Sequence, residues 1–212
     1  MKIADPITPK VAAELDAWDG SDSDVVEIDR DLVDGADFAN ATRLSADASR
    51  IENSVLTGLS LDKLEMSDVV AGRLEAAALS AYKARMLRVE LSDSRLTGSE
   101  FAEGSFEDCT FRNVKFDEAG FRFAKFKRVR FESCMLRACD FSSAKFEHVT
   151  FTGCDLEAAN FVSASCKAVD VTGEDLSLVK GLLGLKGATI STEQLMQLAP
   201  MLAAELGFEV RA

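Results

Sequence analysis

Apolar residues recur at every fifth position over more than half of this chain, and this period constrains the fold more than any other feature. The series starts at Ile51 and Leu56 and continues through Val171 to Leu176. A period of five matches neither an α-helix, with 3.6 residues per turn, nor a strand, whose side chains alternate. Because one five-residue unit cannot bury its own apolar side chains, the repeat predicts stacked units that form a solenoid.

A second position of each unit is also apolar or small. It lies two residues before the first, as at Ala124, Val129 and Cys134, whereas the other three positions are mostly polar or charged. We therefore expect two side chains of every five to point inward. The expected core column contains the phenylalanines of the repeat: Phe101, Phe106, Phe111, Phe116, Phe121, Phe126, Phe131, Phe141, Phe146, Phe151 and Phe161.

The charged residues indicate how many units make one turn. When each charged residue between positions 50 and 176 is compared with the one twenty positions later, thirteen pairs are opposite in sign and four are alike. One such series reads Asp68, Arg88, Asp108, Arg128 and His148. Side chains stacked in adjacent coils would lie about 4.8 Å apart, where opposite charges attract. A lap of four units is therefore predicted, with the same wall reached again at every twentieth position.

The units resemble those of pentapeptide-repeat proteins, whose consensus is a small residue, Asp or Asn, Leu or Phe, and two polar residues. Good matches are Ala159-Asn160-Phe161, Cys139-Asp140-Phe141 and Cys154-Asp155-Leu156. The resemblance covers about residues 31–178. It implies an all-β solenoid, a right-handed quadrilateral β-helix, here with a C-terminal capping or dimerisation α-helix.

One stretch departs from the pattern. From Leu59 to Ala81 the larger residue occupies the earlier inward position, and Ala fills three of the later ones. We interpret this as swapped packing within the β-helix. The alternative is a local helix across residues 71–84, because that run is rich in Ala and Leu.

Residues 1–30 form an acidic segment that we expect to cover one open end of the rod. A helical turn is predicted across residues 11–18 and a short strand across residues 25–28. The first coil is expected to begin near Ala36-Asp37-Phe38.

Residues 179–212 are predicted to be a Gly-rich connector, an amphipathic helix and a short terminal strand around Phe208 and Val210. Ser191 and Gln194 have the spacing of a capping box, whereas Pro200 should kink or split the helix. Its apolar stripe would serve equally as a monomeric cap or as an end-to-end dimer contact. The stripe residues are Leu195, Leu198, Leu202 and Leu206.

The composition sets the expected location. No apolar run is long enough to span a membrane, and the N-terminus lacks a signal pattern, so we expect a cytoplasmic protein. Of the five cysteines, four occupy the small inward position and Cys166 a larger one, as buried hydrophobes would. A disulfide between Cys134 and Cys154, one coil apart, is the alternative.

The sequence shows no catalytic, cofactor or metal site. His148 is the single histidine, which excludes a site with two histidine ligands. It is predicted to face outward, and nothing marks its neighbours Ser142, Ser143, Thr150 or Thr152 as an activated nucleophile. The Gly-rich connector does not have the spacing of a phosphate-binding loop. We therefore predict a protein that is not an enzyme.

One basic segment is a candidate partner-binding patch, because no acidic residue occurs between Ala119 and Phe131. An exposed aromatic among cations can bind an anionic partner. The simpler interpretation is that acids of neighbouring coils, such as Glu107 and Glu147, neutralise it. The patch consists of Arg122, Phe123, Lys125, Lys127, Arg128 and Arg130.

The favoured function is a rigid protein-interaction scaffold with an unidentified partner, as a monomer or a homodimer, and without direct binding of nucleic acid or membrane. The alternative follows from the resemblance, because some pentapeptide-repeat proteins mimic DNA and protect DNA gyrase from quinolones or toxins. The net charge of −12 agrees with mimicry. However, the predicted faces carry no continuous acidic stripe, which mimicry of closely spaced phosphates requires.

Overall fold

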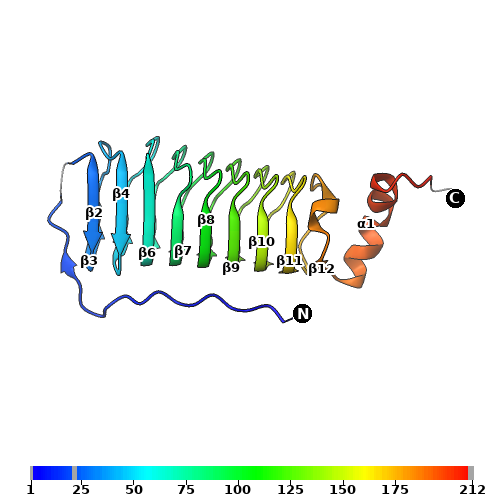
Figure 1. Cartoon of the computed structure of the whole chain (residues 1–212), viewed down its shortest axis with the longest axis horizontal. Helices are drawn as coiled ribbons and strands as arrows, with labels where there is room; N and C mark the ends of the chain where they lie inside the picture. Colours follow the sequence, from blue (N-terminus) through cyan, green and yellow to red (C-terminus); the bar gives the residue numbers. More distant parts are fainter. Residues whose placement is uncertain (1, 21–22, 210–212) are drawn as a thin grey trace.

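The computed structural model describes residues 2–20 and 23–209, which form a straight rod of stacked coils (Figure 1). The strands belong to one parallel sheet that winds around the rod axis, and a helix projects from the C-terminal end. The strands are β1 (Asp16–Ala17), β2 (Val25–Asp29), β3 (Asp31–Asp34), β4 (Arg43–Asp47), β5 (Arg50–Glu52), β6 (Lys63–Gly72), β7 (Arg85–Ser92), β8 (Ser105–Arg112), β9 (Lys125–Glu132), β10 (Lys145–Thr152), β11 (Ser165–Asp170) and β12 (Ala188–Thr189).

The predicted lap of four units is observed directly in the strand register. Phe106 of β8 pairs with Phe126 of β9, which in turn pairs with Phe146 of β10. The first lap is shorter, because Val25 pairs with Arg43 and not with Ser45. Coiling therefore begins at β2, before the start expected near Ala36-Asp37-Phe38.

Each lap has four corners. From Asp68 to Gly173, every fifth residue adopts a left-handed backbone conformation, with φ near +55° at Glu103, Asp108 and Asn113. These corners bend the chain by about a quarter turn, and the intervening residues form four flat walls. The quadrilateral cross-section expected from the repeat is thus built from its regular positive-φ positions.

Stacked aromatic rings fill the middle of the rod. Every phenylalanine of the expected core column is at most 2% exposed. Rings one lap apart lie face to face, as for Phe126 and Phe146, whose centroids are 5.0 Å apart with planes 6° from parallel. In the coils before Phe101 the core consists mainly of Val, Leu, Ile, Met and Ala. The burial of these apolar side chains is the main source of stability for such a fold.

The segment rich in Ala and Leu remains within the β-helix. Leu64, Leu74 and Leu79 are buried, and so are Ala71 and Ala76 at the later inward positions. Glu75 and Ser80 form bridges to the adjacent coils. The packing is therefore swapped, and the alternative of a helix across residues 71–84 is wrong.

Opposite charges one lap apart meet along the outer walls. Among the described residues, eight ion pairs join side chains at equivalent positions of successive laps. These are Glu65–Arg85, Asp68–Arg88, Lys83–Glu103, Glu107–Lys127, Asp108–Arg128, Arg112–Glu132, Arg137–Glu157 and Glu147–Lys167.

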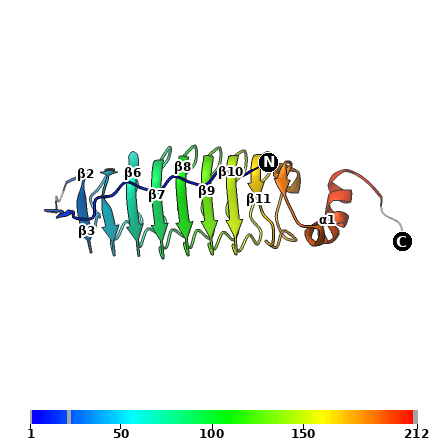
Figure 2. The ribbon, with the colours of Figure 1, turned by 90° about the horizontal axis from the view of Figure 1, so that it is seen from below.

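The N-terminal segment differs from the expectation. No helix lies in residues 11–18, all of which are described; β1 there pairs with β3. Trp18 packs on Phe38, with ring centroids 5.6 Å apart, and covers the first coil. Residues 3–10, which we call the strap, do not cover that end and instead run along the side of the rod toward its far end (Figures 1 and 2).

The C-terminal region contains a 3-10 helix, η1 (Leu182–Leu185), followed by β12 and by α1 (Thr192–Glu205). Ser191 and Gln194 form the predicted capping box. However, α1 continues through Pro200 and is not split. No strand is present at Phe208, and Val210 lies outside the described residues. In the described part of the chain, no helix combines the length and apolarity needed to cross a bilayer.

Candidate functional site

The six residues of the candidate basic patch do not share one wall. Phe123 and Arg128 are both corner residues with positive φ, so the chain turns twice within this segment. Lys125 and Lys127 occupy the wall between these corners, whereas Arg122 precedes the first and Arg130 follows the second. The segment therefore presents its cations in three directions.

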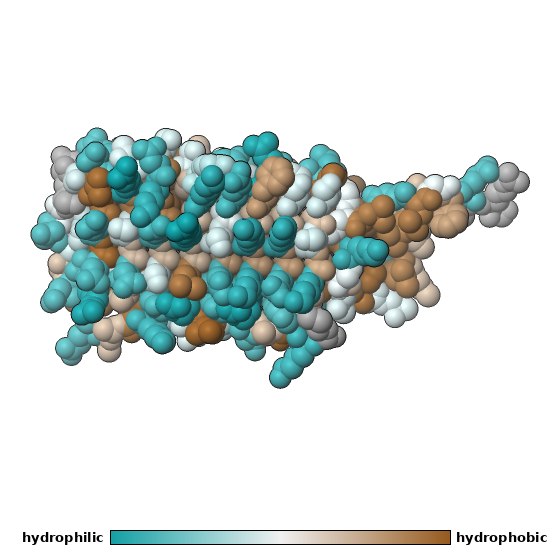
Figure 3. All heavy atoms as spheres, viewed as in Figure 1, coloured by the Kyte–Doolittle hydropathy of each residue, from teal (hydrophilic) through white to brown (hydrophobic). Residues whose placement is uncertain are grey.

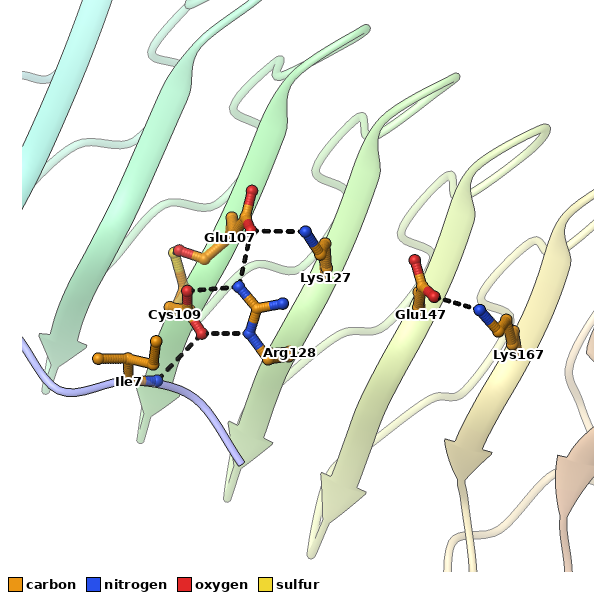
Figure 4. Close-up of polar contacts among 8 residues, drawn as sticks. Ile7, Glu107, Cys109, Lys127, Arg128, Glu147 and Lys167 are labelled. Carbon is orange, nitrogen blue, oxygen red and sulfur yellow. Dashed lines mark hydrogen bonds and ion pairs between the residues drawn. The ribbon is translucent and has the colours of Figure 1, made fainter. Parts of the chain in front are cut away.

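Most of these cations also have acidic partners. Lys127 Nζ lies 2.7 Å from Glu107, and Arg128 contacts both Glu107 and Asp108 (Figure 4). The remaining pairs are Arg122 with Asp140, and Arg130 with Asp5 and Glu132. Among the described residues, Lys125 makes no ion pair, and Phe123 is 59% exposed. This arrangement agrees with the simpler interpretation, in which neighbouring acids neutralise the patch.

A different line of residues is more highly organised. One corner of successive coils carries Asp68, Arg88, Asp108, Arg128 and His148, which we call the corner ridge. Arg88 and Arg128 each direct two guanidinium nitrogens onto the carboxylate one lap before, Asp68 and Asp108 respectively. Paired, two-point hydrogen bonds of this kind hold the acceptors in a fixed geometry.

The strap donates backbone hydrogen bonds to this corner ridge at regular intervals. The N–H of Lys10 donates to Asp68 (2.9 Å), that of Ile7 to Asp108 (3.1 Å, Figure 4) and that of Ala4 to Nδ1 of His148 (3.1 Å). Each donor is three residues from the next, and each acceptor is two laps from the next. His148 therefore faces outward, as expected, but serves as an acceptor that the sequence analysis did not identify.

These contacts change the acidity of the two carboxylates. The hydrogen bonds from Arg88 and from the Lys10 N–H outweigh burial and hold the pKa of Asp68 below its usual value. Burial raises the pKa of Asp108, but the hydrogen bonds from Arg128 and the Ile7 N–H more than compensate, so the pKa is lowered. Both carboxylates are thereby favoured as charged acceptors.

The C-terminal end is attached to the last coil by polar side chains. Gln194 Nε2 donates to the carbonyl oxygens of Val171 (2.7 Å) and Glu174 (2.8 Å). The Glu174 carboxylate accepts the N–H groups of Gly153 and Cys154, although burial raises its pKa. These bonds supply hydrogen-bond partners to backbone groups at the end of the sheet. They fix α1 against the rod.

The apolar stripe of α1 is divided between the rod and the solvent. Leu198 is buried and Leu202 half-buried, and both line a groove of about 260 Å³ between α1 and η1. Leu195 and Leu206 are at least half exposed, as are Met196 and Phe208 beside them. The end of the molecule therefore shows a gathered apolar surface (Figure 3).

The cysteine side chains are all present as thiols. All five cysteines are free, so Cys134 and Cys154 form no disulfide. Burial raises the pKa of Cys109 and Cys139 to about 12, which leaves both as neutral thiols. No group of three or more His, Cys, Asp or Glu side chains suited to a metal ion occurs in the described ranges.

Comparison with known proteins agrees with the repeat. Residues 84–161 match the family model described as "Pentapeptide repeat region". No curated protein matches the chain in sequence.

Solved structures of similar shape include QnrB1 in a trypsin-treated form, a plasmid-mediated fluoroquinolone resistance protein, at 18% identity and a TM-score of 0.40 over 88% of this chain and 92% of that one. HetL from the cyanobacterium Nostoc, involved in heterocyst differentiation regulation, is 16% identical, with a TM-score of 0.33 over 77% and 78% of the two chains. Rfr23 from the cyanobacterium Cyanothece is 17% identical, with a TM-score of 0.25 over 66% and 88%.

Proposed function

We propose that this chain, a pentapeptide-repeat protein, is a non-enzymatic binding scaffold that pairs end to end with a second copy through its C-terminal surface. In this proposal the rod supplies rigidity, and the exposed walls of the resulting longer rod contact a further protein in the cytoplasm. Repeat solenoids generally work through such extended surfaces.

The observation that carries the proposal is the apolar surface around α1. Leu195, Met196, Leu206 and Phe208 are each exposed by half or more. Apolar surface gathered in one place usually marks a contact with another molecule. A two-fold contact uses the same surface on both copies, so one such end is sufficient to pair two rods.

Mimicry of DNA is a less suitable proposal for these walls. The described acids along the coils are largely opposed by bases one lap away, as Glu107 is by Lys127 and Glu147 by Lys167. A surface that imitates a phosphate backbone needs uncompensated negative charge at short, regular intervals. We therefore do not expect this protein to replace DNA on gyrase.

Sedimentation velocity at micromolar concentration tests the pairing. We expect the wild type to sediment as a dimer and Met196→Asp, which places a charge on the 74% exposed side chain, to sediment as a monomer. Val162→Asp is the matched control, because Val162 is 49% exposed on the body of the rod. Leu198 is unsuitable for this purpose, since a charge at a buried position would disturb folding. A monomeric wild type would contradict the proposed dimer.

A DNA gyrase supercoiling assay separates the scaffold from the mimic. Addition of the protein should leave the supercoiling rate unchanged. Inhibition that disappears when salt is raised would contradict our proposal and favour electrostatic mimicry.

A further inference from the structure

The strap and the corner ridge have matching repeats. An extended chain in the polyproline conformation advances about 9.3 Å in three residues and returns to the same face. Two laps of the rod advance about 9.6 Å. The N–H groups of Ala4, Ile7 and Lys10 consequently reach acceptors on every second coil without a change in strap geometry.

The sequence of the strap suits this conformation. Ile3, Pro6 and Pro9, also three residues apart, are its half-buried side chains, and each directly precedes a donating N–H. Proline restricts φ to the polyproline region and favours an extended conformation in the residue before it. Asp5, directly before the first proline, forms an ion pair with Arg130.

On the wall beside the corner ridge, small and large side chains alternate from one lap to the next. Val70, Thr110 and Thr150 stand two positions after the three acceptors, whereas the larger Glu90 and Arg130 occupy this position on the coils between. Smaller side chains therefore lie beside the points at which the strap is bonded. Hydrogen-bond acceptors and smaller side chains therefore both recur at every second lap along this part of the surface.

We propose that this corner ridge is a docking track for an extended, proline-containing segment of a partner protein, and that the strap is its resident occupant and leaves when that segment binds. The matching segment has an acidic residue followed by two prolines three residues apart, each succeeded by a residue with a free N–H. This surface is separate from α1, so the inference does not depend on end-to-end pairing.

The strap is built to be exchanged. Apart from the ion pair between Asp5 and Arg130, its bonds to the rod come from main-chain N–H groups, which every residue except proline offers at the same spacing in an extended segment. Ala4, Ile7 and Lys10 are exposed, with Ile7 at 52%, so little apolar surface holds the strap in place. A partner with a better fit to the half-buried positions would therefore displace it.

Full-length variants altered only in the strap test the proposal. In the double variant Ile7→Pro and Lys10→Pro, two donating N–H groups are removed while the corner ridge is untouched. The matched control is Thr8→Pro, because the Thr8 N–H donates no hydrogen bond among the described residues. The probe is a fluorescently labelled synthetic peptide of residues 2–12, followed by anisotropy, with thermal unfolding to verify that each variant remains folded.

The double variant should bind this peptide about tenfold more tightly than the wild type and the control, as expected if the strap occupies the track about nine-tenths of the time. A peptide carrying proline at the positions of Ile7 and Lys10 should not bind. Equal affinity for the wild type and the double variant, or equal binding of the substituted peptide, would overturn the proposal. A change of oligomeric state in the double variant would also overturn it, because the strap would then be exchanged between two copies.

Discussion

Replacement of Phe126 by Ala should destabilise the rod strongly. Phe126 is 1% exposed, and its ring lies 4.9 Å from that of Phe106 and 5.0 Å from that of Phe146. A buried Phe→Ala change costs about 3–5 kcal/mol, through lost transfer free energy and the cavity that remains. Because aromatic contacts above, below and beside the ring are lost as well, we expect about 4–5 kcal/mol.

Phe123→Ala provides the matched control. Phe123 lies three positions earlier, but it occupies a corner and is 59% exposed. Alanine already stands at other corners, such as Ala138 and Ala158, with the same positive φ. We therefore expect the unfolding free energy to change by no more than about 0.5 kcal/mol, as is usual for surface substitutions.

Unfolding in guanidinium chloride, followed by circular dichroism, measures the difference. With a denaturant dependence of about 5 kcal/mol per M for a chain of this size, Phe126→Ala should lower the midpoint by about 1 M. The Phe123→Ala midpoint should stay close to that of the wild type. Equal shifts for the two variants would show that the period of five does not determine which phenylalanines form the core.

Three further predictions concern the end cap, the strap and the thiols. Gln194→Ala removes the side-chain donor to the carbonyl oxygens of Glu174 and Val171, of which only Val171 keeps a backbone donor, the Glu174 N–H. Hydrogen exchange should therefore accelerate in α1 but not in β8, and stability should fall by about 1–3 kcal/mol. The pKa values of Asp68 and Asp108 lie below the usual value near 3.9, so their contribution to stability is present above that pH. It is lost as the pH falls through the lowered values, and exchange of the strap amides should rise there first. Cys109 and Cys139 should resist thiol reagents at pH 8 until the protein unfolds, and rapid labelling of the native protein would contradict their burial.

The architecture was predictable because its cause is visible in the sequence. A side chain that must face the core at every fifth residue leaves a repeated apolar position, and Phe106 and Phe126 indeed stack one lap apart. The length of one lap was predictable from the charged residues. Asp108 and Arg128, for example, attract each other only when a lap of four units places them side by side.

The basic patch shows what a linear sequence does not display. Arg122 and Arg130 belong to one segment without acids, but the period of five places two corners within that segment, at Phe123 and Arg128. In α1 the sequence likewise shows a single apolar stripe from Leu195 to Leu206. Only the coil against which α1 packs determines that Leu198 faces inward and Leu195 outward.

The sequence does not predict the position of the strap, because the strap is bonded to the corner ridge through backbone N–H groups, and these leave no pattern of side chains in the sequence. Two signals existed nevertheless. Pro6 and Pro9 have the three-residue spacing of a polyproline helix, and the acids at 68 and 108 recur on alternate coils. Neither signal alone predicts that the two segments bind each other. Their match appears only when the rise of three strap residues is compared with the rise of two laps along the rod.

Because the positive-φ corners recur regularly, an insertion keeps the walls of this molecule aligned only if it has certain lengths. Insertion of four whole units would add one lap of about 4.8 Å and leave the residues of every wall aligned as before. Insertion of a single unit would keep the core filled but rotate everything beyond it by a quarter turn, so that Asp108 would face a residue of another column instead of Arg128. Gene duplication can therefore lengthen such a rod and keep the pairing of charges on its outer walls only if it adds whole laps of four units.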